Sequence, residues 1–177
     1  MDVGSVICMN FSKEKMKEVI HYIIGKCEHK TNFGRTVLYK LLYFSDFDYF
    51  ELNKKAITNE TYEKYPYGPL PIHFDEVKEE LVDEKKIIET ESDIFPGSIH
   101  TKFKYKSLTS PAINLLNNDE LERIDETIKL LSNKTAGEIS DYSHDDIPWR
   151  ATEDKEVIDY YYVFYRNPPY SIRELNV

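Results

Sequence analysis

The sequence has few of the patterns on which membrane proteins, disulfide-stabilised domains and most enzymes depend. No apolar run approaches the roughly 18 residues that a membrane helix needs, and the first residues lack a signal-peptide pattern. The two cysteines, Cys8 and Cys27, form neither a CxxC pair nor a metal-ligand spacing, so we expect free thiols in a reducing compartment. Glycine-rich phosphate loops, HExxH and GxSxG are all missing. These absences predict a cytoplasmic protein that uses no membrane and no cofactor and is not an enzyme.

What is present is an ordinary globular composition with an uneven distribution of charge. The 177 residues are 41% hydrophobic and 31% charged, which predicts a single domain over residues 1–177 with a real core. Of the net charge of −9, almost all lies in residues 117–159, where 13 acidic residues stand against 5 basic ones. An acidic segment repels nucleic-acid phosphates and attracts basic partners, although a solvated helical face has the same composition.

Apolar periodicity predicts a mainly α fold with one small antiparallel β-hairpin. We expect a first helix capped by Ser12, a central helix over about 35–50, a loop over 51–65 and a helix over about 70–82. Residues 87–91 and 99–107 read as the two strands of the hairpin. A helix from about 118, a short helix after Thr135 and a last helix over about 153–165 complete the expected order.

The stretch KYPYGPLP, residues 64–71, is the most unusual connector in the chain. Its three prolines restrict the backbone, and prolines without an N–H are tolerated in the first turn of a helix. The prolines and Gly68 therefore predict a stiff turn that leads into the 70–82 helix. A turn does not require Tyr65 and Tyr67, so these tyrosines remain as candidates for contact with a partner.

The predicted hairpin offers an alternative, a winged-helix-like regulator that binds nucleic acid. His100, Lys102, Lys104 and Lys106 alternate along the second strand and give it one basic face. Glu89 and Glu91 alternate along the first strand, so we expect them to face the lysines and neutralise them. Together with the acidic segment, this pairing makes nucleic acid an unlikely partner.

A second alternative is a metal-dependent enzyme using His144 and Asp145 of the run His144-Asp145-Asp146, joined by His73 and Asp75. Two histidines and nearby carboxylates can hold zinc. His144 and Asp145, however, stand where a helix must end, and polar residues at such a position have a ready structural role. We expect no metal for this reason.

Tyrosine is abundant, at 14 of 177 residues, and three tyrosines are consecutive at 160–162. Three neighbours on a helix cannot all point in one direction, so at least one, for which we take Tyr161, should face solvent. Exposed tyrosines are favoured in protein interfaces. Aromatic anchors beside an acidic surface are suited to binding a basic protein.

Three stretches together resemble a known family. They are KLLYFSDFDYF (40–50), ITNETYEKYPYGPLP (57–71) and SHDDIPWR (143–150). In this order and spacing they resemble the Panacea, or SocA-like, antitoxin domain of prokaryotes and their phages, with the likeness spanning about residues 33–165. The resemblance implies a mostly helical, non-enzymatic protein that binds and neutralises a toxin encoded beside it, in some relatives as an adaptor to a cellular protease.

The resemblance and the residue patterns together predict a partner-binding surface for a basic toxin. The signature turn and the late SHDDIPW stretch supply some candidates, and the acidic segment and the tyrosine run supply the others. The nine candidates are Tyr65, Tyr67, Gly68, Pro69, Glu122, Glu126, His144, Trp149 and Tyr161. The sequence leaves the identity of the toxin and the oligomeric state open.

Overall fold

A computed structural model describes residues 10–98 and 101–173, and Cys8 and His100 therefore lie outside the described residues. The helices are α1 (Lys13–Cys27), α2 (Arg35–Asn53), α3 (Phe74–Asp83), α4 (Asn118–Leu131), α5 (Ala136–His144) and α6 (Ile147–Arg150), with a 3₁₀ helix η1 (Tyr160–Tyr165). The strands are β1 (Tyr62–Tyr65), β2 (Gly68–Pro71), β3 (Ile87–Asp93) and β4 (Thr101–Ser107). The fold is mainly α with a small β part, as the periodicity predicts.

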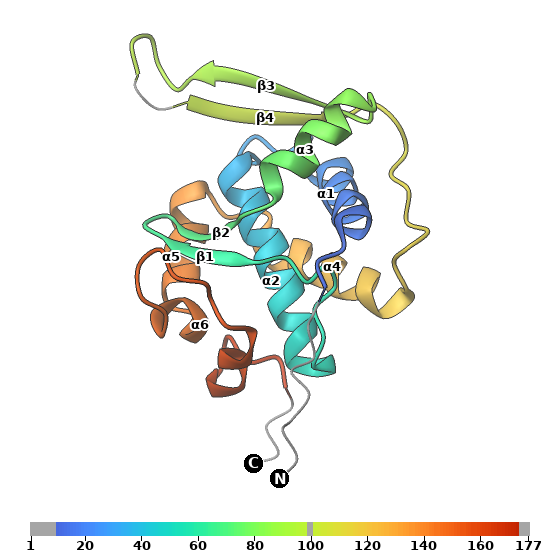
Figure 1. The fold of residues 1–177 in the computed structure, drawn as a ribbon. Coiled ribbons are helices and arrows are strands. Elements are labelled where there is room, and N and C mark those ends of the chain that lie inside the picture. Colours follow the sequence, from blue (N-terminus) through green and yellow to red (C-terminus); the bar gives the residue numbers. More distant parts are fainter. Residues whose placement is uncertain (1–9, 99–100, 174–177) are drawn as a thin grey trace.

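Helix α2 is the centre of the fold. It contacts α1, α4, α5 and η1 as well as strands β2 and β4, and the other elements surround it (Figure 1). Leu38, Leu41, Phe47 and Phe50 are buried on different sides of it, because an apolar surface wider than one stripe can be covered only by neighbours all round. The prediction of a central second helix is confirmed.

Capping boxes mark the starts of α4 and α5 at the positions that the sequence predicts. Asn117 accepts from the Glu120 amide while the Glu120 carboxylate accepts from the Asn117 amide, and Thr135 and Glu138 form the same capping box at the start of α5. Ile124 and Leu131, which lie seven residues apart in α4 and so share one face of the helix, are buried. The predictions for both helices are confirmed.

The KYPYGPLP stretch differs from its prediction as a helix entry. Residues 68–71 form β2, which pairs antiparallel with β1 in the register Tyr65↔Gly68 and Tyr62↔Pro71, and α3 begins only at Phe74. The outer side of β1 is occupied by a bridge between Glu63 and Val157, which leaves β2 as an edge strand. Proline is tolerated on such an edge, where its missing N–H does not interrupt a ladder.

The prediction of a last helix over 153–165 is also wrong. The Ile158 amide donates to the Tyr62 carbonyl oxygen at 2.8 Å, and the Lys155 amide donates to the Lys64 carbonyl oxygen at 2.9 Å. This extended segment covers β1, and only η1 is helical. Tyr161 is nevertheless 55% exposed and Tyr160 is buried, so the prediction that one of the three tyrosines faces solvent is confirmed.

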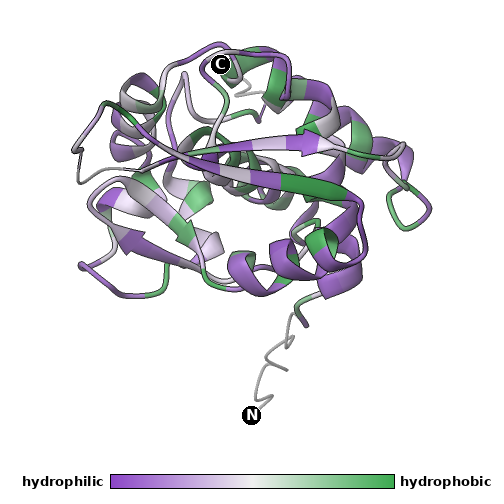
Figure 2. Ribbon diagram, turned by 90° about the horizontal axis from the view of Figure 1, so that it is seen from above, coloured by the Kyte–Doolittle hydropathy of each residue, from purple (hydrophilic) through white to green (hydrophobic). Residues whose placement is uncertain are grey.

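The second hairpin, β3–β4, lies across the top of the helices, as Figure 1 and the view from above in Figure 2 both show. Its existence is as predicted, but its pairing is not. Glu89 lies opposite Tyr105 and Glu91 opposite Phe103, while Lys104 faces Thr90. Glu89 instead accepts hydrogen bonds from Arg35 and Lys78 on the helices below. The expected neutralisation of the strand lysines by Glu89 and Glu91 is therefore wrong, because the two sets of side chains lie on opposite faces.

Candidate functional site

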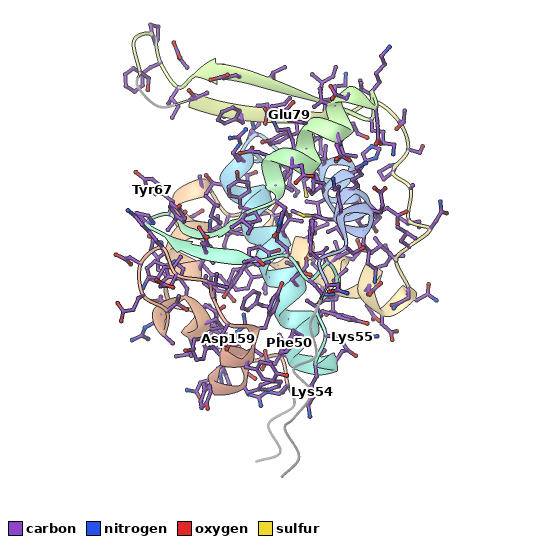
Figure 3. The ribbon with its side chains drawn as sticks, viewed as in Figure 1. Phe50, Lys54, Lys55, Tyr67, Glu79 and Asp159 are labelled. Atoms are coloured by element: carbon purple, nitrogen blue, oxygen red, sulfur yellow. The ribbon has the colours of Figure 1, made fainter. Side chains whose placement is uncertain are left out.

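The turn between β1 and β2 presents one large side chain to solvent. Pro66 and Tyr67 form the turn, and Tyr67 is 73% exposed, the most of any large apolar or aromatic side chain described. Its side chain projects from the outer edge of the molecule in Figure 3. Gly68 and Pro69 directly behind it are buried, so they position the turn and leave Tyr67 as its contact surface.

Helix α5 and a lysine of α2 hold this turn from below. The Ser140 hydroxyl donates to the Tyr67 carbonyl oxygen at 3.2 Å, and the Lys40 ammonium donates to the Pro69 carbonyl oxygen at 3.2 Å. Gly68 has φ of +98° and packs so closely that an added Cβ would lie 2.3 Å from Ser143 Oγ. Only glycine combines this backbone conformation with such close approach.

Trp149 and His144 fix the other side of the turn. The Trp149 indole N–H donates to the Tyr65 carbonyl oxygen at 3.3 Å, and the His144 ring stacks on Trp149 with 4.3 Å between ring centroids. The Lys64 ammonium also contacts the Trp149 ring in a cation–π interaction, 4.2 Å from the ring centroid. His144 Nε2 is buried without a hydrogen-bond partner among the described residues. We call Tyr65–Pro69, Lys40, Ser140, Ser143, His144 and Trp149 together the turn site.

A buried ion network lies behind the turn site and joins it to the C-terminal residues. Asp146 accepts from Tyr43 Oη at 2.8 Å and from Arg166 through Nε at 2.8 Å and Nη2 at 2.6 Å. The remaining Arg166 nitrogen, Nη1, donates to Asp48 at 2.8 Å and Glu51 at 3.1 Å. All of these side chains are buried. Because Asp146 is the N-cap of α6, the network ties α2 to the helix that carries Trp149.

Lys40 is the one member of the turn site whose charge is strongly disfavoured. It is 2% exposed, and no described carboxylate bonds to it. Burial without a counter-ion lowers the pKa of Lys40 from its ordinary 10.5 to about 7.

We expect Lys40→Met to stabilise the protein at pH 7 by about 2 kcal/mol, because losing the hydrogen bond to the Pro69 carbonyl oxygen offsets about half of what removing the buried charge would give. The unfolded chain takes up a proton near pH 10.5, whereas folded Lys40 takes it up only near pH 7. Stability therefore falls as the pH is lowered from about 10 to about 7 and is level below that. In urea titrations at several pH values, the free energy of unfolding of the wild type should rise between pH 7 and 9, and that of Lys40→Met should not. Lys129→Met, at an exposed position of α4, is the control, and equal pH dependence in wild type and Lys40→Met would contradict the prediction.

The remaining predicted residues lie away from the turn site. Glu122 and Glu126 are on α4, which packs on α1 and α2, and Figure 1 shows α4 and the turn on different sides of α2. Both glutamates line a groove of about 310 Å³ that also includes Leu52. Tyr161, on η1, packs edge-on against Phe50 at 5.2 Å between centroids. The structure thus groups six of the nine candidates and separates Glu122, Glu126 and Tyr161 from them.

The residues proposed for a metal are not brought together. His73 Nδ1 lies 2.7 Å from Glu60 Oε1 at the start of α3, and His144 lies in the turn site. Within residues 10–98 and 101–173, no group of three or more histidine, cysteine, aspartate or glutamate side chains is arranged to hold a metal ion. Of the helices in the same ranges, none combines the length and apolar character needed to span a bilayer.

Sequence reasoning missed Lys40, Ser140 and Arg166, and it considered Asp146 only as a candidate metal ligand. Lys40 interrupts an apolar run of α2 in the sequence, which is a usable signal, because a lysine in a fully buried helix needs an internal acceptor. Asp146 and Arg166 give no such signal, since the adjacent Asp145 is exposed and nothing in the sequence distinguishes the two aspartates.

Comparison with known proteins gives one finding. The family model described as "Antitoxin SocA-like, Panacea domain" matches residues 38–150, which include most of α2, the turn site and helix α6 with Trp149. No curated protein and no solved structure matches the chain.

Proposed function

The chain belongs to the SocA-like antitoxin family with a Panacea domain, and we propose that it binds and neutralises a cognate toxin by direct protein–protein contact. In this proposal the protein performs no catalysis. The toxin is a basic protein, and the complex can serve either to block the toxin or to deliver it to a protease.

The observation that carries the proposal is the convergence of three distant stretches on the turn site. Lys40 comes from the first stretch, Tyr65–Pro69 from the second and Trp149 from the third. A turn held by hydrogen bonds from three segments loses little conformational entropy when a partner binds, which favours tight association. Such support is more than a simple connection between two strands requires.

The chemistry of the exposed residues favours a protein partner. Tyr67 is an aromatic side chain on a rigid backbone, the kind of residue that dominates binding energy in protein interfaces. Lys64 and Trp149, which contact each other beside Tyr65, add partly exposed aliphatic and aromatic surface next to the turn. Glu122 and Glu126 supply negative charge on another side of α2, which can steer a basic partner without touching it.

The proposal predicts different kinetic effects for the two sets of residues. Tyr67→Ala should leave the association rate nearly unchanged and speed dissociation from the neighbouring gene's product about thirtyfold, which corresponds to about 2 kcal/mol. Reversing the charges of Glu122 and Glu126 should instead slow association and flatten its dependence on salt. Surface plasmon resonance at several salt concentrations separates the two rates.

The chain offers matched controls for both changes. Tyr165 is 71% exposed, nearly the same as Tyr67, so Tyr165→Ala removes an equally exposed tyrosine elsewhere. Reversing Glu91 and Asp93 on β3 changes the net charge by the same amount at a different place. If folded variants at Tyr67 and Tyr165 dissociate alike, the turn site is not the interface.

A further inference from the structure

A second groove lies beneath the β3–β4 hairpin, and the proposed function does not use it. It has a volume of about 470 Å³ and is formed by the start of α2, the start of α5 and one end of the hairpin. None of its lining residues belongs to the turn site. We call it the hairpin groove; the residues that matter for its chemistry are Arg35, Val37, Ile94, Lys102, Phe103 and Ala136.

The walls of the hairpin groove are mostly apolar. Val37 is fully buried beneath the groove, Phe103 is partly buried, and Ile94 is 58% exposed at the edge. The volume lies within the range of about 300–1,000 Å³ that is usual for ligand sites. One large apolar side chain of a partner fits such a space.

The charged groups of the hairpin groove are all cationic. Arg35 stacks on Phe103, with 3.6 Å from the guanidinium carbon to the ring centroid, and donates to Glu89 through Nη2 and to Tyr105 through Nε. Its Nη1 has no acceptor among the residues that the structure describes. Lys102 is exposed on β4 and likewise forms no hydrogen bond or ion pair with any described residue. Among the residues described in the lining of the groove, none is acidic.

The backbone at the start of α2 adds donors to the same cationic groove. Gly34 is the N-cap and no side chain caps the helix, so its first amide N–H groups have no acceptor from within the helix. A side chain at this position is excluded because a Cβ on Gly34 would lie 2.8 Å from the Phe103 carbonyl oxygen. Gly34, Arg35, Thr36 and Val37 all line the groove.

We propose that the hairpin groove binds a short acidic segment of a partner protein, with one large apolar side chain seated against Ile94 and Phe103. Charge complementarity selects the partner. In a chain with a net charge of −9, the charged residues described in the lining of this groove are Arg35, which is paired with Glu89, and Lys102, which pairs with no described residue, whereas the groove beside Glu122 and Glu126 is acidic. The apolar walls favour a peptide over a nucleic acid, since a phosphate backbone has no side chain to seat there.

Fluorescence anisotropy with labelled hexapeptides tests the proposal on the intact protein. The probe is Asp-Glu-Leu-Phe-Glu-Asp, for which we expect saturable binding with a Kd of about 100 μM or tighter. A peptide with lysine in place of every acid, and an acidic peptide with Ser-Gly in place of Leu-Phe, should each bind at least about tenfold more weakly. Hexathymidine is the nucleic-acid probe and should also bind more weakly.

Variants locate the binding in the hairpin groove. Lys102→Glu should weaken binding of the acidic probe about tenfold, while Lys106→Glu, the same change four residues along the same strand, should alter it less than about twofold. Ala136→Trp, at an exposed first residue of α5, should fill the groove and abolish binding. Amide chemical shifts of residues 34–37 and 101–103 should move on titration, and circular dichroism verifies that each variant is folded.

Several results would overturn the proposal. They are equal binding of the lysine peptide, stronger binding of hexathymidine, and equal effects of Lys102→Glu and Lys106→Glu in folded proteins. Dimerisation in sedimentation experiments that the acidic peptide does not reverse would assign the groove to a second copy of the chain instead. Because the Tyr67 variants do not alter this groove, the proposal can fail while the toxin-binding proposal stands, and the reverse also holds.

Discussion

Asp146→Ala should lower the free energy of unfolding by about 4 kcal/mol, the largest effect that we expect from any single side chain of this protein. The carboxylate is fully buried and accepts three hydrogen bonds, one from Tyr43 and two from Arg166. Removing it leaves three buried donors without their acceptor, and each such donor costs about 1–3 kcal/mol. Asp48 and Glu51 still bond to Arg166, which keeps the loss near the middle of the range for a broken buried ion pair.

The adjacent aspartate supplies the control. Asp145 is exposed at the C-cap of α5, so Asp145→Ala should change stability by less than about 0.5 kcal/mol. Tyr43→Phe should cost about 1 kcal/mol in the wild type and nothing in the Asp146→Ala background, where its hydroxyl no longer has an acceptor. Urea denaturation of the four proteins measures the coupling. Similar losses for Asp145→Ala and Asp146→Ala would show that the buried ion network does not stabilise the fold.

The elements that could be predicted from the sequence are those specified by neighbouring residues. The capping boxes at Asn117 and Thr135 lie within four residues of the amides they satisfy, and the buried apolar residues of α4 recur at helical spacing. The hairpin over 87–107 carries its own turn. Such signals act locally, so a single sequence contains them in full.

The β1–β2 hairpin could not be predicted because it depends on a segment about 90 residues away. Pro69 and Pro71 favour a helix start when read alone. They occupy an edge strand because the chain near Val157 pairs with the other side of β1. The same segment would otherwise complete a helix with η1. One long-range pairing therefore accounts for both incorrect helix predictions.

The turn site could be predicted only in part, because the residues that support it are also distant in the sequence. The exposed tyrosine and the glycine of the turn are recognisable from composition, but their supports are not. Ser140 lies 73 residues from its partner Tyr67, and Tyr43 lies 103 residues from Asp146. Nor could the hairpin register be predicted, since a shift of one residue exchanges the faces on which Glu89 and the lysines lie.

Gly68→Ala should destabilise the protein by about 3 kcal/mol and weaken partner binding by more than that loss of stability explains. The alanine Cβ would lie 2.3 Å from Ser143 Oγ and 2.4 Å from Lys40 Cε, so the turn must move away from α5 and α2. The φ of +98° adds a backbone cost of its own. Because Tyr67 is the preceding residue, the movement displaces the side chain proposed to anchor the toxin.

A substitution at Gly97 separates the cost of the close contacts from the cost of the backbone conformation. Gly97 has φ of +81°, similar to Gly68, but a Cβ there meets no described atom within 4 Å. Gly97→Ala should therefore cost only about 1 kcal/mol, the backbone part alone, and leave toxin binding unchanged. Adding Ser143→Ala to Gly68→Ala removes the closest contact and should restore part of both stability and affinity, as measured by urea denaturation and plasmon resonance. If Gly68→Ala costs no more than Gly97→Ala, the turn is not held tightly against α5, and the rigid presentation of Tyr67 loses its physical basis.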